Sequence, residues 1–175
     1  MNYFELFEIP VQLKADAAAL KKKFYELSRR YHPDFFSQST EAEQSEVLEI
    51  SSQLNKAWKT FQQPDDTIKY VLQLKGLLEE EEKYELPPAF LMEMMEINEE
   101  LMEAQENPDH LPVLHKRIAQ LEEELYEPVK PIIEQYKEGI TTEKELLQVK
   151  DYYFRKKYLH RILDKMDAMR NIAPR

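Results

Sequence analysis

The 175-residue chain contains no cysteine and only two glycines. Without cysteine it cannot form disulfides, use a thiolate nucleophile, or hold zinc or an iron–sulfur cluster through sulfur ligands. The shortage of glycine leaves few positions for tight β-hairpins or phosphate-cradling loops. No nucleophile elbow, P-loop or zinc-helix motif occurs, and glutamates on helix surfaces are by default solvated charges. We therefore expect a helical protein that is not an enzyme and carries no cofactor.

Long apolar runs are also missing, since none approaches the roughly 20 residues that a membrane span needs. The first residues include Glu5 and Glu8 and no basic segment, so we expect a soluble intracellular protein without membrane contact. Histidines with metal-ligand spacing are absent too. No second ligand lies at a fixed helical spacing from any two of His110, His115 and His160, and we expect solvated or capping roles and no metal site.

Acidic residues outnumber basic ones, and the excess is unevenly placed. The formal net charge of −10 argues against general nucleic-acid binding, which needs cations to neutralise phosphates. Residues 1–75 hold 10 Lys and Arg against 11 Asp and Glu, whereas residues 76–175 hold 14 against 23. This shift predicts two parts: a first domain over 1–75 and an acidic linker over 76–86, followed by a second domain over 87–175.

In the first part, apolar residues recur at helical spacing on both sides of His32-Pro33-Asp34. Such a tripeptide arises by accident in a chain of this length with a chance on the order of one per cent. Pro33 disfavours the α conformation at His32, so the preceding helix must end there. The pattern predicts an antiparallel helical hairpin with this tripeptide in an exposed loop at its tip. Five basic residues lie largely off the apolar face of the first helix: Lys21, Lys22, Lys23, Arg29 and Arg30.

The second part shows three helical patterns, over 88–106, 110–138 and 142–171, separated by short turns. Three antiparallel helices with short connections predict a bundle. Pro128 and Pro131 fall inside the middle pattern, where proline removes a hydrogen bond and clashes with the preceding turn. We expect a kink there and leave a break open.

The first of these patterns has an apolar surface wider than one packing seam. At about 100° per residue, Phe90, Met94, Ile97 and Leu101 form one stripe, which we assign to the bundle core. Leu91 and Met95 lie about 100° round from that stripe, and Met92, Glu96 and Glu99 lie further round still. A helix with two neighbours also needs a broad face, so Leu91 fits a core role equally well. Methionines next to charge favour an adaptable binding surface for a partner protein.

The first seventy-five residues resemble the J-domain of DnaJ-type co-chaperones. The resemblance rests on Tyr3-Phe4-Glu5-Leu6-Phe7, the basic helix and His32-Pro33-Asp34, with Phe35 where a lysine is common. It implies an ATPase chaperone of the DnaK type as partner, bound through His32, Pro33, Asp34, Lys22, Lys23, Arg29 and Arg30.

The string Pro88-Ala89-Phe90-Leu91-Met92-Glu93-Met94-Met95-Glu96, placed after a J-domain, makes the whole chain similar to the HscB family, the J-type co-chaperones of iron–sulfur cluster biogenesis. This resemblance implies an all-α fold, a DnaK/HscA-type ATPase as one partner, and an IscU-type cluster scaffold protein as the other. The implied scaffold-binding residues are Leu91, Met92, Met95, Glu96, Glu99 and Phe154. Eukaryotic members can carry a cysteine-rich zinc segment, which this chain lacks, so we expect a bacterial cytoplasmic protein.

Two other functions stay open at this stage. A generic J-protein could deliver another client through the same bundle, since a methionine-rich surface accepts many partners. A helical structural or oligomerisation protein, in which His32-Pro33-Asp34 is incidental, would self-associate through Leu91 and Met95. A weak homodimer is compatible with either reading.

Overall fold

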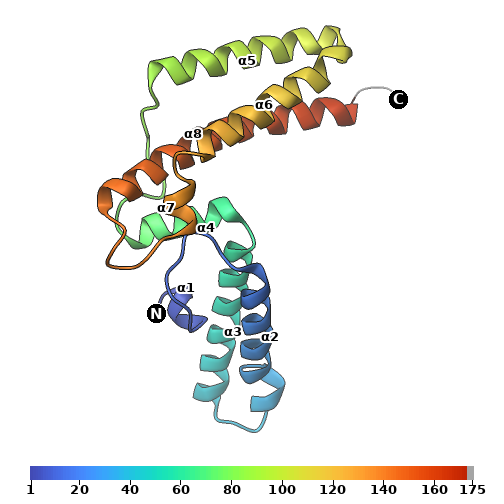
Figure 1. The fold of residues 1–175 in the computed structure, drawn as a ribbon. Helices are drawn as coiled ribbons and strands as arrows, with labels where there is room; N and C mark the ends of the chain where they lie inside the picture. Colours follow the sequence, from blue (N-terminus) through green and yellow to red (C-terminus); the bar gives the residue numbers. More distant parts are fainter. Residues whose placement is uncertain (173–175) are drawn as a thin grey trace. The chain divides into compact units, whose positions relative to one another are not determined.

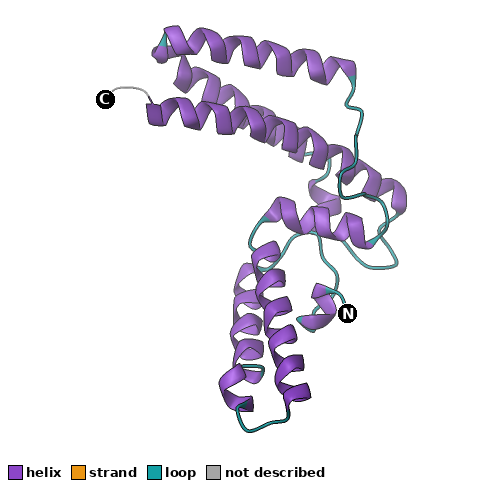
Figure 2. Ribbon diagram, turned by 180° about the vertical axis from the view of Figure 1, so that it is seen from behind, coloured by secondary structure: helices purple, strands orange, loops and turns teal. Residues whose placement is uncertain are grey.

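The structure is a computed structural model that describes residues 1–172. Every regular element in that range is a helix (Figure 2), as the sequence predicted. The chain divides into two compact units. The first unit comprises residues 1–76 together with 133–142, and the second comprises 77–132 together with the chain from 143 onward.

The first unit is built around a helical hairpin (Figure 1). Its second and third α-helices pack side by side, and the short 3₁₀ helix η1 lies in the connection between them. Side-chain caps fix where both helices begin: Asp16 accepts a hydrogen bond from the Ala19 amide at 3.2 Å, and Thr40 forms a capping box with Glu43. The elements of this unit are α1 (Tyr3–Leu6), α2 (Ala17–Arg30), η1 (Pro33–Phe36), α3 (Glu41–Phe61) and α4 (Pro64–Leu74).

Aromatic rings attach α1 to this hairpin. Phe7 is fully buried, with its ring centroid 5.2 Å from that of Phe61 on α3 and 6.5 Å from that of Phe24 on α2. Phe24 in turn stacks on Trp58 at 4.8 Å. Large rings bury much apolar area for each position and add ring–ring attraction. The short α1 is therefore held by packing, because four residues cannot form a stable helix alone.

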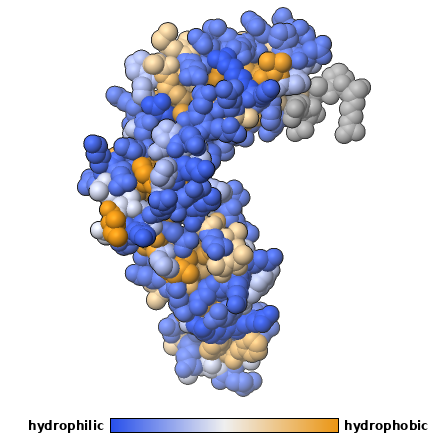
Figure 3. Space-filling model, viewed as in Figure 1, coloured by the Kyte–Doolittle hydropathy of each residue, from blue (hydrophilic) through white to orange (hydrophobic). Residues whose placement is uncertain are grey.

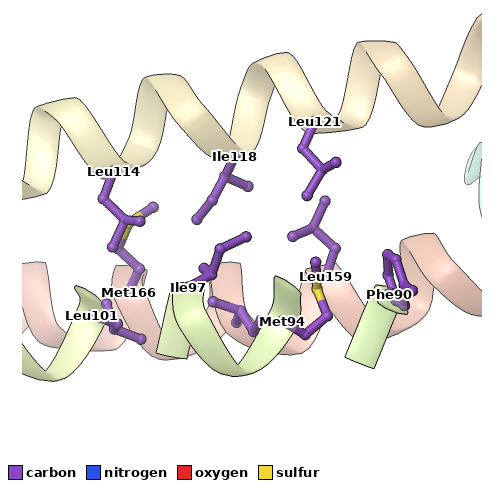
Figure 4. Close-up of a cluster of buried hydrophobic side chains, with 10 residues drawn as sticks. Phe90, Met94, Ile97, Leu101, Leu114, Ile118, Leu121, Leu159 and Met166 are labelled. Atoms are coloured by element: carbon purple, nitrogen blue, oxygen red, sulfur yellow. The ribbon is translucent and has the colours of Figure 1, made fainter. Parts of the chain in front are cut away.

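The second unit is a bundle of three long helices around one apolar core (Figure 4). The predicted core stripe of α5 is confirmed: Phe90, Met94, Ile97 and Leu101 are all buried and face the other two helices. Leu114, Ile118 and Leu121 come from α6, and Leu159, Ile162 and Met166 from α8. The elements here are α5 (Pro88–Glu106), η2 (Pro108–His110), α6 (Leu111–Tyr126), α7 (Lys130–Glu134) and α8 (Glu143–Ile172).

The middle pattern is broken rather than kinked. Helix α6 ends at Tyr126, and α7 begins at Lys130 after a turn that contains Pro128. Two prolines three residues apart remove two amide donors and crowd the preceding turns, so one continuous helix over 110–138 is not formed.

The segment from the end of α7 to the start of α8 differs from the expected division, which placed all of 87–175 in the bundle. Residues 133–142 pack with the first unit. Glu134 accepts a hydrogen bond from the Lys14 ammonium at 3.0 Å, and Glu138 pairs with Lys75. These ion pairs join residues 133–142 to residues far away in the sequence. Residue spacing along the chain cannot predict them.

The stretch expected as an extended acidic linker is packed on α8. Leu78 is buried, and the Tyr84 ring stacks on Phe154 with centroids 4.5 Å apart. The Glu82 carboxylate lies 2.7 Å from the Lys150 ammonium. The apolar and aromatic side chains of this segment thus extend the bundle, although acidic residues surround them in the sequence.

Candidate functional site

The first candidate site is the turn formed by His32, Pro33 and Asp34. His32 has extended backbone angles and caps η1, its Nδ1 accepting a hydrogen bond from the Asp34 amide at 3.3 Å. Pro33 occupies the start of η1, where its missing N–H costs nothing. The Phe35 amide donates to the His32 carbonyl at 3.0 Å. The sequence predicted an exposed loop, and the structure gives a hydrogen-bonded 3₁₀ turn.

This turn presents one charged group to solvent. The Asp34 side chain is 88% exposed, and one carboxylate oxygen lies 3.6 Å from His32 Nδ1. The neighbouring Phe35 ring is also exposed and meets the His32 ring edge-on at 6.0 Å. A fixed backbone beneath an exposed carboxylate suits a charge-assisted hydrogen bond or ion pair with a cationic group of a partner.

The four basic residues of α2 that the resemblance assigns to chaperone binding fall into two pairs. Lys22 and Arg29 are exposed, as predicted. Lys23 and Arg30 both bind the carboxylate of Glu8: Lys23 Nζ lies 3.0 Å from one oxygen and Arg30 Nη1 lies 2.9 Å from the other. The Lys23 side chain is only 22% exposed. Arg30 is thus exposed like Lys22 and Arg29, as predicted, whereas Lys23 is half-buried, and Glu8 pairs with both Lys23 and Arg30.

The second candidate site is the face of α5 beside its core stripe. Met92 and Met95 expose 64% and 60% of their surface, while Leu91 is half-buried. Glu96 and Glu99 are exposed, and a Glu96 oxygen lies 3.7 Å from Arg117 on α6. Figure 3 shows hydrophobic colour over the first turns of α5 within largely hydrophilic surroundings. Exposed methionines bordered by carboxylates form an apolar surface with an acidic rim.

Phe154 is held differently from these residues. It is half-buried under Tyr84, whose hydroxyl donates to the Asp151 carboxylate at 2.8 Å. Burial, followed by this hydrogen bond and the nearby Asp151 charge, raises the pKa of Tyr84 to about 12. The sequence reasoning missed Tyr84, although an aromatic side chain inside an otherwise acidic stretch was an available signal.

The contacts between α5 and α8 are made by residues close to the predicted Leu91 and Phe154. The Arg155 guanidinium lies 5.2 Å from the Phe90 ring centroid, and Tyr158 meets the same ring edge-on at 6.3 Å. These contacts join the first turn of α5, which contains Leu91, to the part of α8 that contains Phe154. Leu91 and Phe154 therefore lie on adjoining parts of one unit, while Met95 and Glu99 lie further along α5.

Metal sites and membrane-spanning helices are the other features considered for the described residues. Within residues 1–172, no cluster of three or more acidic or histidine side chains is arranged to hold a metal ion. His160 Nε2 lies 3.4 Å from a carboxylate oxygen of Glu122, while His110 and His115 are exposed. In the same range, no helix combines the length and the apolar character needed to cross a membrane.

An antiparallel hairpin with a His-Pro-Asp turn, followed in the same chain by a three-helix bundle, defines a J-domain protein with a helical C-terminal module. Residues 86–167 match the family model described as the HSCB C-terminal oligomerisation domain. The chain is similar to the structure of chaperone HscB from Vibrio cholerae, with 26% identity, a TM-score of 0.75 and coverage of 98% of each chain. It is also similar to human co-chaperone protein HscB, with 29% identity, a TM-score of 0.79 and coverage of 97% of this chain and 82% of the human one. Over residues 86–167 the chain is therefore related to the HscB co-chaperones, and over nearly its whole length it shares their fold.

Proposed function

We propose that the chain joins an IscU-type iron–sulfur scaffold protein to a DnaK/HscA-type ATPase chaperone and stimulates ATP hydrolysis by that chaperone. The observation that carries the proposal is the presence, on one chain, of an ordered His-Pro-Asp turn and an exposed methionine face on separate compact units. Similarity to HscB co-chaperones supports both partners, because the resemblance implies a protein that acts between a scaffold and a specialised chaperone.

The J-domain side of the proposal rests on charge. Asp34 offers its carboxylate to a cation of the chaperone, and the turn holds the backbone that carries this carboxylate. Lys22 and Arg29 present positive charge to solvent on α2. Complementary charge raises association rate and specificity more than final affinity. The chaperone surface that fits this unit therefore has at least one basic group to pair with Asp34. Acidic groups around it would attract Lys22 and Arg29.

The bundle side rests on apolar area. Met92 and Met95 supply flexible, polarizable side chains that adapt to a partner surface. Glu96 and Glu99 border them and favour a partner with basic residues at the rim. Phe154 adds a ring whose position is already fixed by Tyr84. Central apolar anchors of this kind commonly supply most of the binding energy of an interface.

Joining two binding units in one chain raises the effective concentration of each partner for the other. The decisive experiment mixes the full-length chain with both purified partners and measures the mass of the complexes by analytical ultracentrifugation, together with ATP hydrolysis. We expect a ternary complex and a higher hydrolysis rate with scaffold than without it. Competition between the two partners for the chain, or no stimulation of hydrolysis, would contradict the proposal.

A second candidate function is self-association through the bundle. The matching family model is described as an oligomerisation domain, and the exposed methionines of α5 are a surface that a second copy could cover. Light scattering over a range of concentrations distinguishes the two. A dimer that dissociates when scaffold is added fits one shared surface, whereas a dimer that persists in the ternary complex places self-association elsewhere.

A further inference from the structure

Glu8 occupies a backbone conformation that side chains rarely adopt. It follows α1 with a φ of +56°, the only non-glycine residue with a positive φ among the described residues. The Glu8 amide donates to the Glu5 carbonyl at 3.0 Å, and the Ile9 amide donates to the Phe4 carbonyl at 3.0 Å. This pattern is a Schellman motif, whose left-handed position is usually glycine because a Cβ is strained there. A glutamate in that place suggests a use for its side chain.

The side chain reaches across to α2 and bridges two cations. Its two oxygens lie 3.0 Å from Lys23 Nζ and 2.9 Å from Arg30 Nη1. Glu26 also pairs with both, at 3.6 Å and 3.0 Å. Hydrogen bonds from Lys23 and Arg30 hold the pKa of Glu8 below its usual value. We call these four residues, Glu8, Lys23, Glu26 and Arg30, the Glu8 cluster.

The charge of the Glu8 cluster depends on Glu8. Two cations and two carboxylates give a net charge of zero, and without Glu8 the cluster would carry a net charge of +1. Lys23, Glu26 and Arg30 of the cluster lie on α2, the helix that also presents Lys22 and Arg29. Exposed ion pairs contribute little to folding stability, so the main physical effect of Glu8 is on the electrostatic potential of this surface.

We propose that Glu8 is an internal counter-anion that lowers the positive potential of α2 and so limits how fast acidic protein surfaces associate with the J-domain. This inference rests on the proposed function, in which the ATPase chaperone is the acidic partner. Glu8 pairs with Lys23 and Arg30, which leaves the exposed Lys21, Lys22 and Arg29 as the cations of α2 that a partner meets first. A partner with suitably placed carboxylates competes with Glu8 for Lys23 and Arg30. An acidic protein without such carboxylates is attracted less strongly than it would be if Glu8 were absent.

The test measures association of the full-length chain with the chaperone by stopped flow at two salt concentrations. Glu8→Gln removes the charge and keeps the backbone strain, and Glu8→Gly removes both. We expect each to raise the association rate about threefold at low ionic strength, with the gain lost at high salt because screening shortens to about 3 Å at 1 M. The agreement of the two variants excludes an effect of backbone strain.

Glu5→Gln is the matched control. Glu5 is exposed on α1 and its carboxylate accepts a hydrogen bond from the Asn2 amide at 3.1 Å, so this variant loses the same charge outside the Glu8 cluster. We expect a gain less than half as large. Equal gains for Glu5→Gln and Glu8→Gln, or unchanged rates for both Glu8 variants, would overturn the inference and leave the proposed function intact. Failure of the unchanged chain to bind any chaperone would overturn the proposed function and this inference with it.

Discussion

The two candidate surfaces differ in what fixes their side chains. Around Asp34, backbone hydrogen bonds, a proline and a histidine cap set the position of each group before a partner arrives. On α5, Met92 and Met95 extend into solvent with several rotatable bonds, and only the helix beneath them is fixed. The first surface is a preorganised polar turn, and the second is an adaptable apolar face.

This difference bears on how each surface tolerates change. A preorganised charged group acts through geometry, so replacing a single atom can remove its effect. An adaptable apolar face acts through buried area, and area is shared among several residues. We therefore expect all-or-none behaviour at the turn and graded behaviour on α5.

Asp34→Asn should have the largest effect. The change is nearly isosteric at an exposed position, so stability should stay within about 0.5 kcal/mol. Loss of the charge should reduce stimulation of ATP hydrolysis about thirtyfold or more, the scale for truncating one member of a buried charged pair. Asp109→Asn is the matched control, because Asp109 follows a proline in the exposed 3₁₀ helix η2 of the other unit. Steady-state hydrolysis and circular dichroism measure both, and full stimulation by Asp34→Asn would refute an all-or-none turn.

Ile97→Ala tests the core beneath the adaptable face. Ile97 is fully buried among α5, α6 and α8 (Figure 4), and removing its side chain should lower the free energy of unfolding by about 2–5 kcal/mol. Scaffold affinity at low temperature, where the variant is still folded, should change little. Thermal unfolding and calorimetry separate the two quantities. A normal melting temperature would mean that this stripe is not the core that its burial indicates.

Met92→Ala combined with Met95→Ala should weaken scaffold binding and leave stability nearly unchanged, the reverse of Ile97→Ala. Both side chains are mainly exposed, so the melting temperature should stay within a few degrees, while scaffold binding should weaken by about 2 kcal/mol or more. Met102→Ala is the control, since Met102 is 67% exposed further along the same helix. Each single variant should lose part of the affinity. If either one alone abolishes binding, α5 is not the graded surface described above.

Both surfaces could be predicted from sequence to the extent that they are local. Helical periodicity identified the core stripe of α5, and the restriction that proline places on the preceding residue identified the turn at His32. The cover that Tyr84 gives to Phe154 could not be predicted, because a stacking contact between residues seventy positions apart leaves no spacing pattern. The same holds for Glu8, whose pairing with α2 depends on a left-handed residue in a short connection.

Lys22→Glu combined with Arg29→Glu concerns the charge around the turn. Reversal of two exposed cations should slow association with the chaperone about fivefold at low ionic strength and weaken its dependence on salt. The dissociation rate should change less. Lys56→Glu with Lys59→Glu makes the same total change on exposed positions of α3. If that control slows association equally, the net charge of the unit matters and the position of the cations does not.

Tyr84→Phe has the smallest expected effect and asks whether Phe154 belongs with the fixed groups or with the adaptable ones. The variant keeps a ring to stack on Phe154 and loses only the hydrogen bond to Asp151, so scaffold affinity near neutral pH should stay within about twofold. In the folded chain the pKa of Tyr84 is raised from its ordinary value of 10 to about 12. The neutral hydroxyl therefore contributes stability that is fully present below pH 10 and is lost as the pH rises toward 12. The unfolding free energy of the unchanged chain should fall more steeply across that interval than that of Tyr84→Phe, as measured by denaturant titration at several pH values. Parallel curves would mean that the hydroxyl does not hold this ring, and Phe154 would then be as adaptable as the methionines of α5.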